Sequence, residues 1–169
     1  MGDEVASDDR WILRSSTTAD IEALMVWFPE KEDVEIWGGP TFRYPFTRTT
    51  FNKDMCWGLM ESYSLFDPEG RFAAFGQLYQ RKQRIHLARL VAEPTMRGQG
   101  IGRRLIRMLM GVGTSLYECD EYSLFVFRGN VPALECYKSL GFVVGDYPEE
   151  MPYADVCYFL TRPVELEEK

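Results

Sequence analysis

An arginine followed by a run of alternating glycines is the part of the sequence with the clearest chemical meaning. The segment Leu90–Arg103 reads LVAEPTMRGQGIGR, so that Arg97 precedes glycines at positions 98, 100 and 102. We expect a buried strand up to Ala92, a proline turn and an amphipathic helix that begins within the glycine run. The first turn of a helix has unpaired N–H groups and a partial positive charge, and glycines let a phosphate approach these donors closely. The segment therefore predicts a pyrophosphate-binding site, with Arg97 as an additional cation.

The spacing of the glycines argues against two other phosphate sites. It is not the GxGxxG pattern with a following acidic residue that dinucleotide-binding folds use, and there is no GK[ST] pair of a Walker A loop. Glycines near a helix start can also serve close packing alone, and this is the structural alternative. The proline turn and Arg97, which accompany the glycines, favour the pyrophosphate.

A second pattern lies about 30 residues further along the chain. The segment Asn130–Phe142 reads NVPALECYKSLGF, in which Asn130 is suited to cap a helix with a proline in its first turn. Gly141 is suited to end that helix. Residues four apart lie on one helix face, so Ala133 and Tyr137 can line the same surface.

Together the two segments resemble the GCN5-related N-acetyltransferases (the GNAT superfamily). Arg97–Gly102 is similar to the family signature [QR]-x-x-G-x-[GA], and Asn130–Phe142 is similar to its N-x-x-A-x-x-x-Y-x-x-x-G-F segment. The resemblance covers roughly residues 71–160. It implies one α/β (α+β) GNAT domain over residues 1–169, whose central mixed, largely antiparallel sheet has six to seven strands. That sheet would be splayed between strands 4 and 5 and flanked by about four helices.

The resemblance implies an enzyme that transfers an acetyl group from acetyl-CoA to an amine of a small molecule or a peptide N-terminus, by direct attack on the thioester. A catalytically idle acetyl-CoA-binding sensor or scaffold is the alternative. Coenzyme A would lie in the gap between the splayed strands. The residues implied for it are Leu90, Val91, Ala92, Arg97, Gly98, Gly100, Ile101, Gly102, Arg103 and Asn130. Of these, the first three would bind the pantetheine and polarise the thioester carbonyl through their main chain, the asparagine would touch the pantetheine arm, and the others would hold the pyrophosphate.

Two side chains are candidates for proton transfer. The resemblance places the Tyr137 hydroxyl near the sulfur, and a phenol with a pKa of about 10 can protonate a departing thiolate. His86 matches a position where arylalkylamine N-acetyltransferases carry a histidine, whereas position 84, a glutamate in histone-type members, is Arg84. With a pKa of about 6.5, His86 could remove the amine proton directly or through water. A buried aromatic and a structural histidine are the alternatives, and a water chain could replace the base.

The N-terminal half is expected to form the acceptor pocket. Strand alternation would put residues 86, 88 and 90 on one face and residues 87, 89 and 91 on the other. A mixture of aromatic and acidic side chains suits an amine with an apolar body, although a solvated acidic helix over an ordinary aromatic core would look the same. Protein N-termini, polyamines, aminoglycosides and arylalkylamines all remain open. The side chains concerned are Trp27, Trp37, Phe42, Tyr44, Phe46, Glu30, Glu32, Asp33 and Glu35.

Periodicity and turn residues predict the elements that position these groups. Strands are expected at residues 11–14, 58–66, 71–80, 85–92, 122–127, 142–144 and 154–160. Helices are expected at residues 18–28, 30–37, 50–57, 98–113 and 130–140. The polar ends, residues 1–9 and 165–169, are expected to fray.

Composition limits the partners. The 169 residues are 46% apolar and 27% charged, which suits one globular domain. The net charge of −7 argues against nucleic acid and is compatible with a cationic acceptor. The four cysteines form no CxxC pair, so no metal site is expected. We expect no membrane span and no secretory signal, and hence a cytoplasmic protein. Family members are often dimers, so a homodimer is possible.

Overall fold

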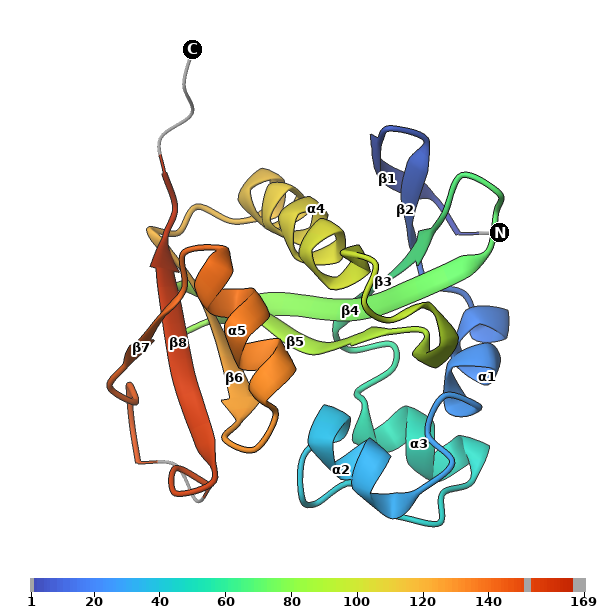
Figure 1. The fold of residues 1–169 in the computed structure, drawn as a ribbon, viewed down its shortest axis with the longest axis horizontal. Helices are drawn as coiled ribbons and strands as arrows, with labels where there is room; N and C mark the ends of the chain where they lie inside the picture. Colours follow the sequence, from blue (N-terminus) through green and yellow to red (C-terminus); the bar gives the residue numbers. More distant parts are fainter. Residues whose placement is uncertain (1, 151–152, 166–169) are drawn as a thin grey trace.

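The computed structural model describes residues 2–150 and 153–165, which form a single mixed sheet with helices on both of its faces (Figure 1). The sheet has eight strands in the order β1-β2-β3-β4-β5-β6-β8-β7. Only β5 and β6 run parallel, and every other neighbouring pair is antiparallel. This confirms the expected fold class, with eight strands where six to seven were expected.

The bounds of the elements lie within a few residues of those expected. The strands are β1 (Glu4–Asp8), β2 (Trp11–Ser15), β3 (Glu61–Phe66), β4 (Phe72–Arg81), β5 (Arg84–Ala92), β6 (Glu121–Phe127), β7 (Val143–Gly145) and β8 (Cys157–Pro163). The helices are α1 (Thr18–Met25), α2 (Lys31–Gly38), α3 (Arg48–Asp54), α4 (Ile101–Leu116) and α5 (Val131–Ser139), with a short 3-10 turn at Pro94–Met96.

The additional strand is β1, where the sequence predicted a frayed end. It pairs antiparallel with β2, and Asp9 and Arg10 turn the chain between them with φ angles of 52° and 67°. Asp8 also forms an ion pair with Arg104 on α4, at 2.8 Å. The prediction of fraying was wrong here because a short polar segment can serve as an exposed edge strand. At the other end, residues 166–169 lie outside the described residues.

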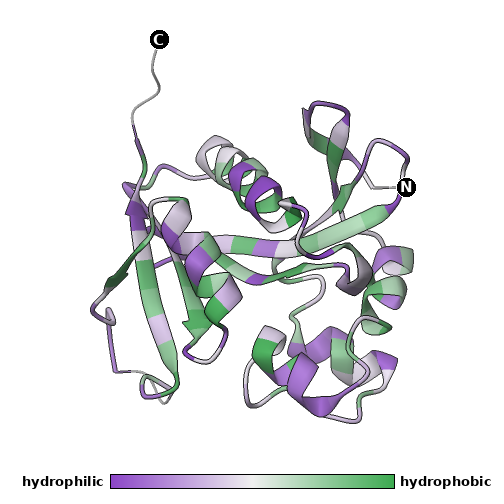
Figure 2. Ribbon diagram, viewed as in Figure 1, coloured by the Kyte–Doolittle hydropathy of each residue, from purple (hydrophilic) through white to green (hydrophobic). Residues whose placement is uncertain are grey.

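Two hydrophobic clusters lie on opposite faces of the sheet. One packs α4 and α5 against the central strands, and the other packs α1, α2 and α3 against the opposite face. Figure 2 shows the central strands as mostly hydrophobic and the helices as mixed. Gly113 lets α4 approach the sheet closely, since a Cβ there would lie 2.6 Å from Ile85 Cγ2. The helices therefore hold the sheet from both sides.

Strands β5 and β6 separate partway along their length. Their pairing is confined to Ile85 with Tyr122, His86 with Ser123, and Leu87 with Leu124. Beyond that point β5 continues beside β4 as far as Ala92, and β6 continues beside β8 to its end. The sheet is therefore splayed between these two strands, which are the fourth and fifth of those expected from the sequence.

A bulge in β5 changes the faces on which its side chains lie. The register with β4 shifts between Phe75–Val91 and Gln77–Ala88, so that β5 has an additional residue, and Arg89 has a φ of 49°. The Leu90 side chain consequently packs over Gly76 on the face that α4 covers. The expected alternation is thus wrong from Arg89 onward, because a bulge reverses the side-chain direction.

Candidate active site

A cavity of about 450 Å³ opens where β5 and β6 separate. Its walls come from the ends of those two strands, from α2, from the start of α4 and from α5. Residues from both sequence motifs therefore meet around one space. The predicted site residues that line it are Leu90, Val91, Ala92, Arg97, Gly102, Asn130 and Tyr137. The predicted residues that do not line it are His86, Gly98, Gly100, Ile101 and Arg103.

The glycine run is open at the surface. Gly98 and Gly100 have φ angles of 82° and 76°, in the left-handed region that favours glycine. A Cβ at Gly98, Gly100 or Gly102 would meet no atom within 4 Å. Close packing alone therefore does not explain these glycines, and the open space fits a phosphate group.

The start of α4 leaves its donors available. Gly100 is the N-cap residue and provides no side-chain cap, and the first hydrogen bond within the helix runs from Arg104 N to Gly100 O, at 3.2 Å. The N–H groups before residue 104 thus have no partner within the helix. Their partial positive charge fits the predicted pyrophosphate.

The two arginines beside the loop differ in their contacts. Arg97 Nε donates to Ala92 O at 3.4 Å, next to the cavity. Arg103 donates to the Ser139 hydroxyl at the end of α5. Ile101 is 3% exposed and packs in the core, so only its main chain could face a ligand. The binding roles of these residues remain predictions.

Helix α5 positions the tyrosine. Asn130 caps the helix by accepting a hydrogen bond from Ala133 N, at 3.4 Å, and Pro132 lies in the first turn. Tyr137 is 8% exposed and lines the cavity. Burial raises the pKa of Tyr137 above its ordinary value, so that the phenol stays protonated at neutral pH.

His86 lies elsewhere, within the sheet. It is 2% exposed, its Nδ1 lies 2.8 Å from Ser123 Oγ, and its ring contacts those of Tyr79 and Phe125. Burial, together with two nearby arginines, lowers the pKa of His86 to about 3. It is therefore neutral at pH 7, but it is not a lining residue of the cavity. Its position does not support the predicted role as the base.

The aromatic residues of the N-terminal half mostly form a core. Trp27, Trp37 and Phe42 are at most 9% exposed and belong to the cluster beneath α1–α3. Of the five aromatic residues proposed for the acceptor pocket, only Trp37 lines the cavity, and of the four acidic residues only Asp33 does so. The Asp33 carboxylate is exposed and accepts a hydrogen bond from Glu30 N at 3.2 Å. Most of this region is thus an ordinary aromatic core with a solvent-exposed acidic helix, which is the alternative to an acceptor pocket.

Several lining residues were not identified from the sequence. They are contributed by α1–α2, by the bulge of β5 and by the free end of β6. The strand assignment and the expected splay could have indicated the end of β6, but no local pattern marks the others. They include Phe28, Ile36, Arg89, Phe125, Val126 and Phe127.

In residues 2–150 and 153–165, no three His, Cys, Asp or Glu side chains gather in a way that could hold a metal ion. No helix in the same ranges has the length and apolar character needed to cross a membrane.

A splayed mixed sheet, with a glycine-led helix and a tyrosine at the opening, defines the acetyltransferase class that the sequence motifs resemble. The model of the Acetyltransferase (GNAT) family matches residues 22–142, which is most of the chain. The chain belongs to this family.

Two curated relatives match a part of the chain. The spermine/spermidine N(1)-acetyltransferase of Bacillus subtilis is 29% identical over 59 residues, which are 35% of this chain and 39% of that protein. The N-acetyltransferase 9-like protein of Nematostella vectensis is 30% identical over 61 residues, which are 34% of this chain and 31% of that protein. The matches thus span well under half of the length of either relative.

Solved structures show a similar fold. The spermidine N-acetyltransferase from Vibrio cholerae, in complex with CoA and spermine, has a TM-score of 0.71 at 15% identity, over 92% of this chain and 96% of that one. The ribosomal-protein-S18-alanine N-acetyltransferase from Escherichia coli has a TM-score of 0.64 at 20% identity, over 94% and 97%. At these identities the likeness concerns the fold.

Proposed function

We propose that this chain is an acetyl-CoA-dependent N-acetyltransferase that acts on an amine of a small molecule or of a peptide N-terminus. The observation that carries the proposal is the cavity between the separated ends of β5 and β6, which is lined both by Gly102 at the start of α4 and by Tyr137 on α5. The family membership supports the same activity.

The chain offers two sets of backbone groups to the acetyl donor. The unpaired N–H groups at the start of α4 would bind its pyrophosphate, with Arg97 beside them. The end of β5, from Leu90 to Ala92, is not paired with β6 and would bind the pantetheine arm by main-chain hydrogen bonds. Acetyl-CoA, when bound, supplies an activated thioester carbonyl.

Tyr137 would protonate the departing sulfur, because its hydroxyl is protonated and the residue lines the cavity. The acceptor amine must be neutral to attack, and its deprotonation costs about 4 kcal/mol for an amine with a pKa near 10 at pH 7. His86 lies outside the lining residues, so we propose that this proton leaves to water.

The experiment mixes the purified chain with acetyl-CoA and a panel of amines and measures the release of free thiol. The panel contains spermidine and spermine, which relatives are named for, together with amino acids, simple amines and peptides with free N-termini. A reaction without amine measures hydrolysis. We expect amine-dependent thiol release and acetylated amine by mass spectrometry. Absence of acetyl-CoA binding would contradict the proposal.

The catalytically idle module makes the same binding prediction. It differs in turnover, since it would bind acetyl-CoA without acetylating any amine. A homodimer and a cytoplasmic location remain predictions as well, which sedimentation and localisation of a tagged chain would test.

A further inference from the structure

Arg89 is a cationic residue in the cavity wall with an unusual backbone conformation. It lies at the bulge of β5 with a φ of 49°, in the left-handed region that residues with side chains rarely adopt. Its carbonyl oxygen accepts a hydrogen bond from Trp37 Nε1, at 2.8 Å. Non-glycine residues in such conformations cluster at functional sites, where the surrounding structure holds them.

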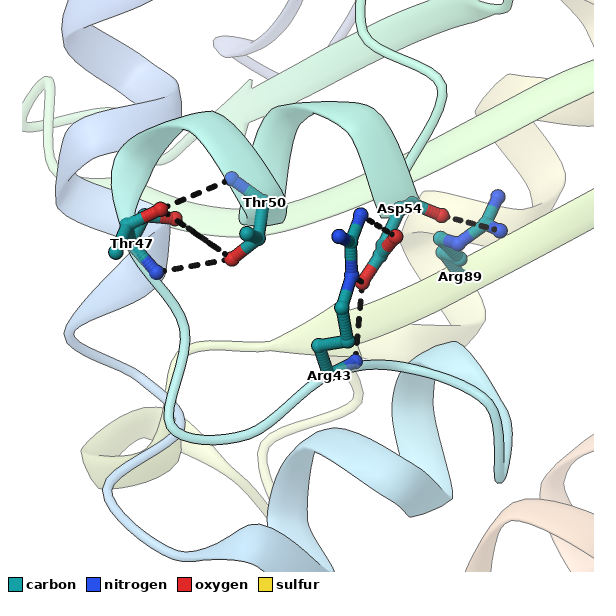
Figure 3. Close-up of polar contacts among 5 residues, drawn as sticks. All are labelled: Arg43, Thr47, Thr50, Asp54 and Arg89. Atoms are coloured by element: carbon teal, nitrogen blue, oxygen red, sulfur yellow. Dashed lines mark hydrogen bonds and ion pairs between the residues drawn. The ribbon is translucent and has the colours of Figure 1, made fainter.

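The guanidinium group of Arg89 contacts neutral acceptors. Its Nη1 donates to Gln77 Oε1 at 2.9 Å. Its Nη2 donates to the carbonyl oxygen of Asp54 at 3.1 Å (Figure 3). Gln77 is fully buried and is itself held by its donations to Met55 O and Ser62 Oγ. Arg89 Nε is buried and has no hydrogen-bond partner among the described residues.

The side-chain carboxylate of Asp54 already forms an ion pair with another residue. Asp54 directs its side chain to Arg43, whose Nη2 lies 2.7 Å from Oδ1 and whose Nε lies 3.1 Å from Oδ2 (Figure 3). Of the carboxylates in the described part of the chain, none lies within 4.0 Å of the Arg89 guanidinium nitrogens. The Asp54 carboxylate acts on the Arg89 charge at longer range, together with the neighbouring Cys56 and Tyr79.

Arg89 is therefore a largely buried cation that forms no ion pair with a carboxylate of the described residues and interacts with Asp54 only at longer range. Burial lowers the pKa of Arg89 below its ordinary value, yet a guanidinium remains charged at neutral pH. Buried charges are normally paired, because an isolated one is costly. A ligand in the cavity that carries a negative charge would supply the missing partner.

The remaining wall is poorly suited to a polycation. Asp33 is the only carboxylate among the lining residues of the described chain, and it is exposed and engaged with Glu30 N. Arg97 adds a second cation, and Phe28 and Trp37 add apolar surface. Such a cavity has no buried carboxylate that could pair with a second ammonium group of an acceptor.

We propose that Arg89 selects the acceptor, and that this acceptor is a monoamine with a carboxylate, of the amino-acid type, rather than a polyamine. The inference rests on the proposed function, since it names the substrate class of that same cavity. The attacking amine is neutral when it reacts, so the charge that Arg89 selects is the charge of the rest of the acceptor. Apolar residues such as Phe28, Ile36 and Trp37 would contact the body of the acceptor.

The experiment compares amines that differ only in a carboxylate. Three pairs cover small, aliphatic and aromatic bodies: alanine with ethylamine, leucine with isoamylamine, and phenylalanine with phenethylamine, with spermidine alongside. We expect kcat/KM of the wild-type chain to favour the carboxylated member of at least one pair by about tenfold or more, and to be lowest for spermidine.

Substitution tests whether Arg89 is the origin of that preference. Arg89→Gln should reduce it by about tenfold or more, mainly through KM for the acceptor, while acetyl-CoA affinity stays unchanged. Arg89→Lys keeps the charge and should keep most of the preference. Arg48→Gln is the matched control, because it removes an exposed arginine that pairs with Glu22. Thermal unfolding checks that each variant is folded. If no variant folds, the preference of the wild-type chain for carboxylated amines still tests the inference.

The outcomes separate the two proposals. Equal or faster acetylation of spermidine, or of the amines without a carboxylate, would overturn the inference and leave the proposed acetyltransferase intact. An unchanged preference in folded Arg89→Gln would overturn the role of Arg89. Acetyl-CoA binding without transfer to any of these amines would overturn the inference, and the proposed function would be overturned as well if peptides with free N-termini were also not acetylated.

Discussion

The two sides of the cavity are built in different ways. The proposed cofactor side is a continuous segment, residues 97–103, whose donors are backbone N–H groups and whose glycines stay open to solvent. The proposed acceptor side gathers Phe28 from the segment between α1 and α2, Trp37 from α2 and Arg89 from β5, and the first two also belong to the aromatic core. A site that one segment forms by its backbone is recognisable from local spacing, whereas a site assembled by packing is not.

The largest effect is expected on the packed side. Phe51→Ala removes a fully buried ring. The centre of this ring lies 4.8 Å from that of Phe46 and 5.6 Å from that of Trp37. The cavity it leaves should lower the free energy of unfolding by about 3–5 kcal/mol, measured by urea denaturation. Leu59→Ala is the control, since Leu59 is 90% exposed and its truncation should change stability by less than about 0.5 kcal/mol. A small effect of Phe51→Ala would mean that this side is not held by its core.

The tyrosine is the group expected to matter most for turnover. Tyr137→Phe removes the hydroxyl that is proposed to protonate sulfur, and kcat should fall by about 10²-fold or more while acetyl-CoA affinity changes little. Tyr63→Phe is the matched control: its ring is also buried, but its hydroxyl donates to Glu61 and it does not line the cavity. An unchanged rate in Tyr137→Phe would assign the proton transfer to another group.

His86 should make the free energy of unfolding depend on pH. Its pKa is lowered to about 3 in the folded chain, so below about pH 6.5 the unfolded chain binds a proton that the folded chain does not. His86 should therefore not reduce the free energy of unfolding above about pH 6.5. As the pH decreases below that value, the free energy of unfolding should decrease, by about 2 kcal/mol at pH 5. Urea unfolding at pH 7.5 and pH 5 measures this loss.

His86→Asn should remove that part of the acid dependence and retain turnover when folded. A selective loss of turnover in this variant, with an unaltered pH dependence of stability, would instead favour the role as a base that the sequence predicted.

The smallest effect is expected at the glycine loop. Gly100→Ala places a side chain at a φ of 76° and beside the proposed pyrophosphate, so coenzyme A affinity should fall by about tenfold, measured by calorimetry. Gly111→Ala is the control within the same helix, where a Cβ also meets nothing within 4 Å. It should leave the affinity unchanged and stabilise the helix by up to about 1 kcal/mol. Equal coenzyme A affinities of the two variants would mean that the glycine loop contributes no more to binding than the rest of α4.

The same contrast explains what the sequence could predict. Helical spacing and turn residues located α4 and α5 well, and the splay followed from the family resemblance. The face of Arg89 was not predictable, because the bulge that turns it depends on pairing with β4 rather than on local spacing. The five N-terminal aromatic residues were ambiguous for a related reason: composition does not tell a core from a pocket, and only Trp37 borders the cavity.

A crystal structure with bound coenzyme A would show whether the start of α4 binds the pyrophosphate. We expect its oxygens to accept hydrogen bonds from backbone N–H groups between residues 98 and 103, within about 3.2 Å, and the pantetheine arm to lie between β5 and β6. Coenzyme A bound with its pyrophosphate away from the start of α4 would contradict this expectation.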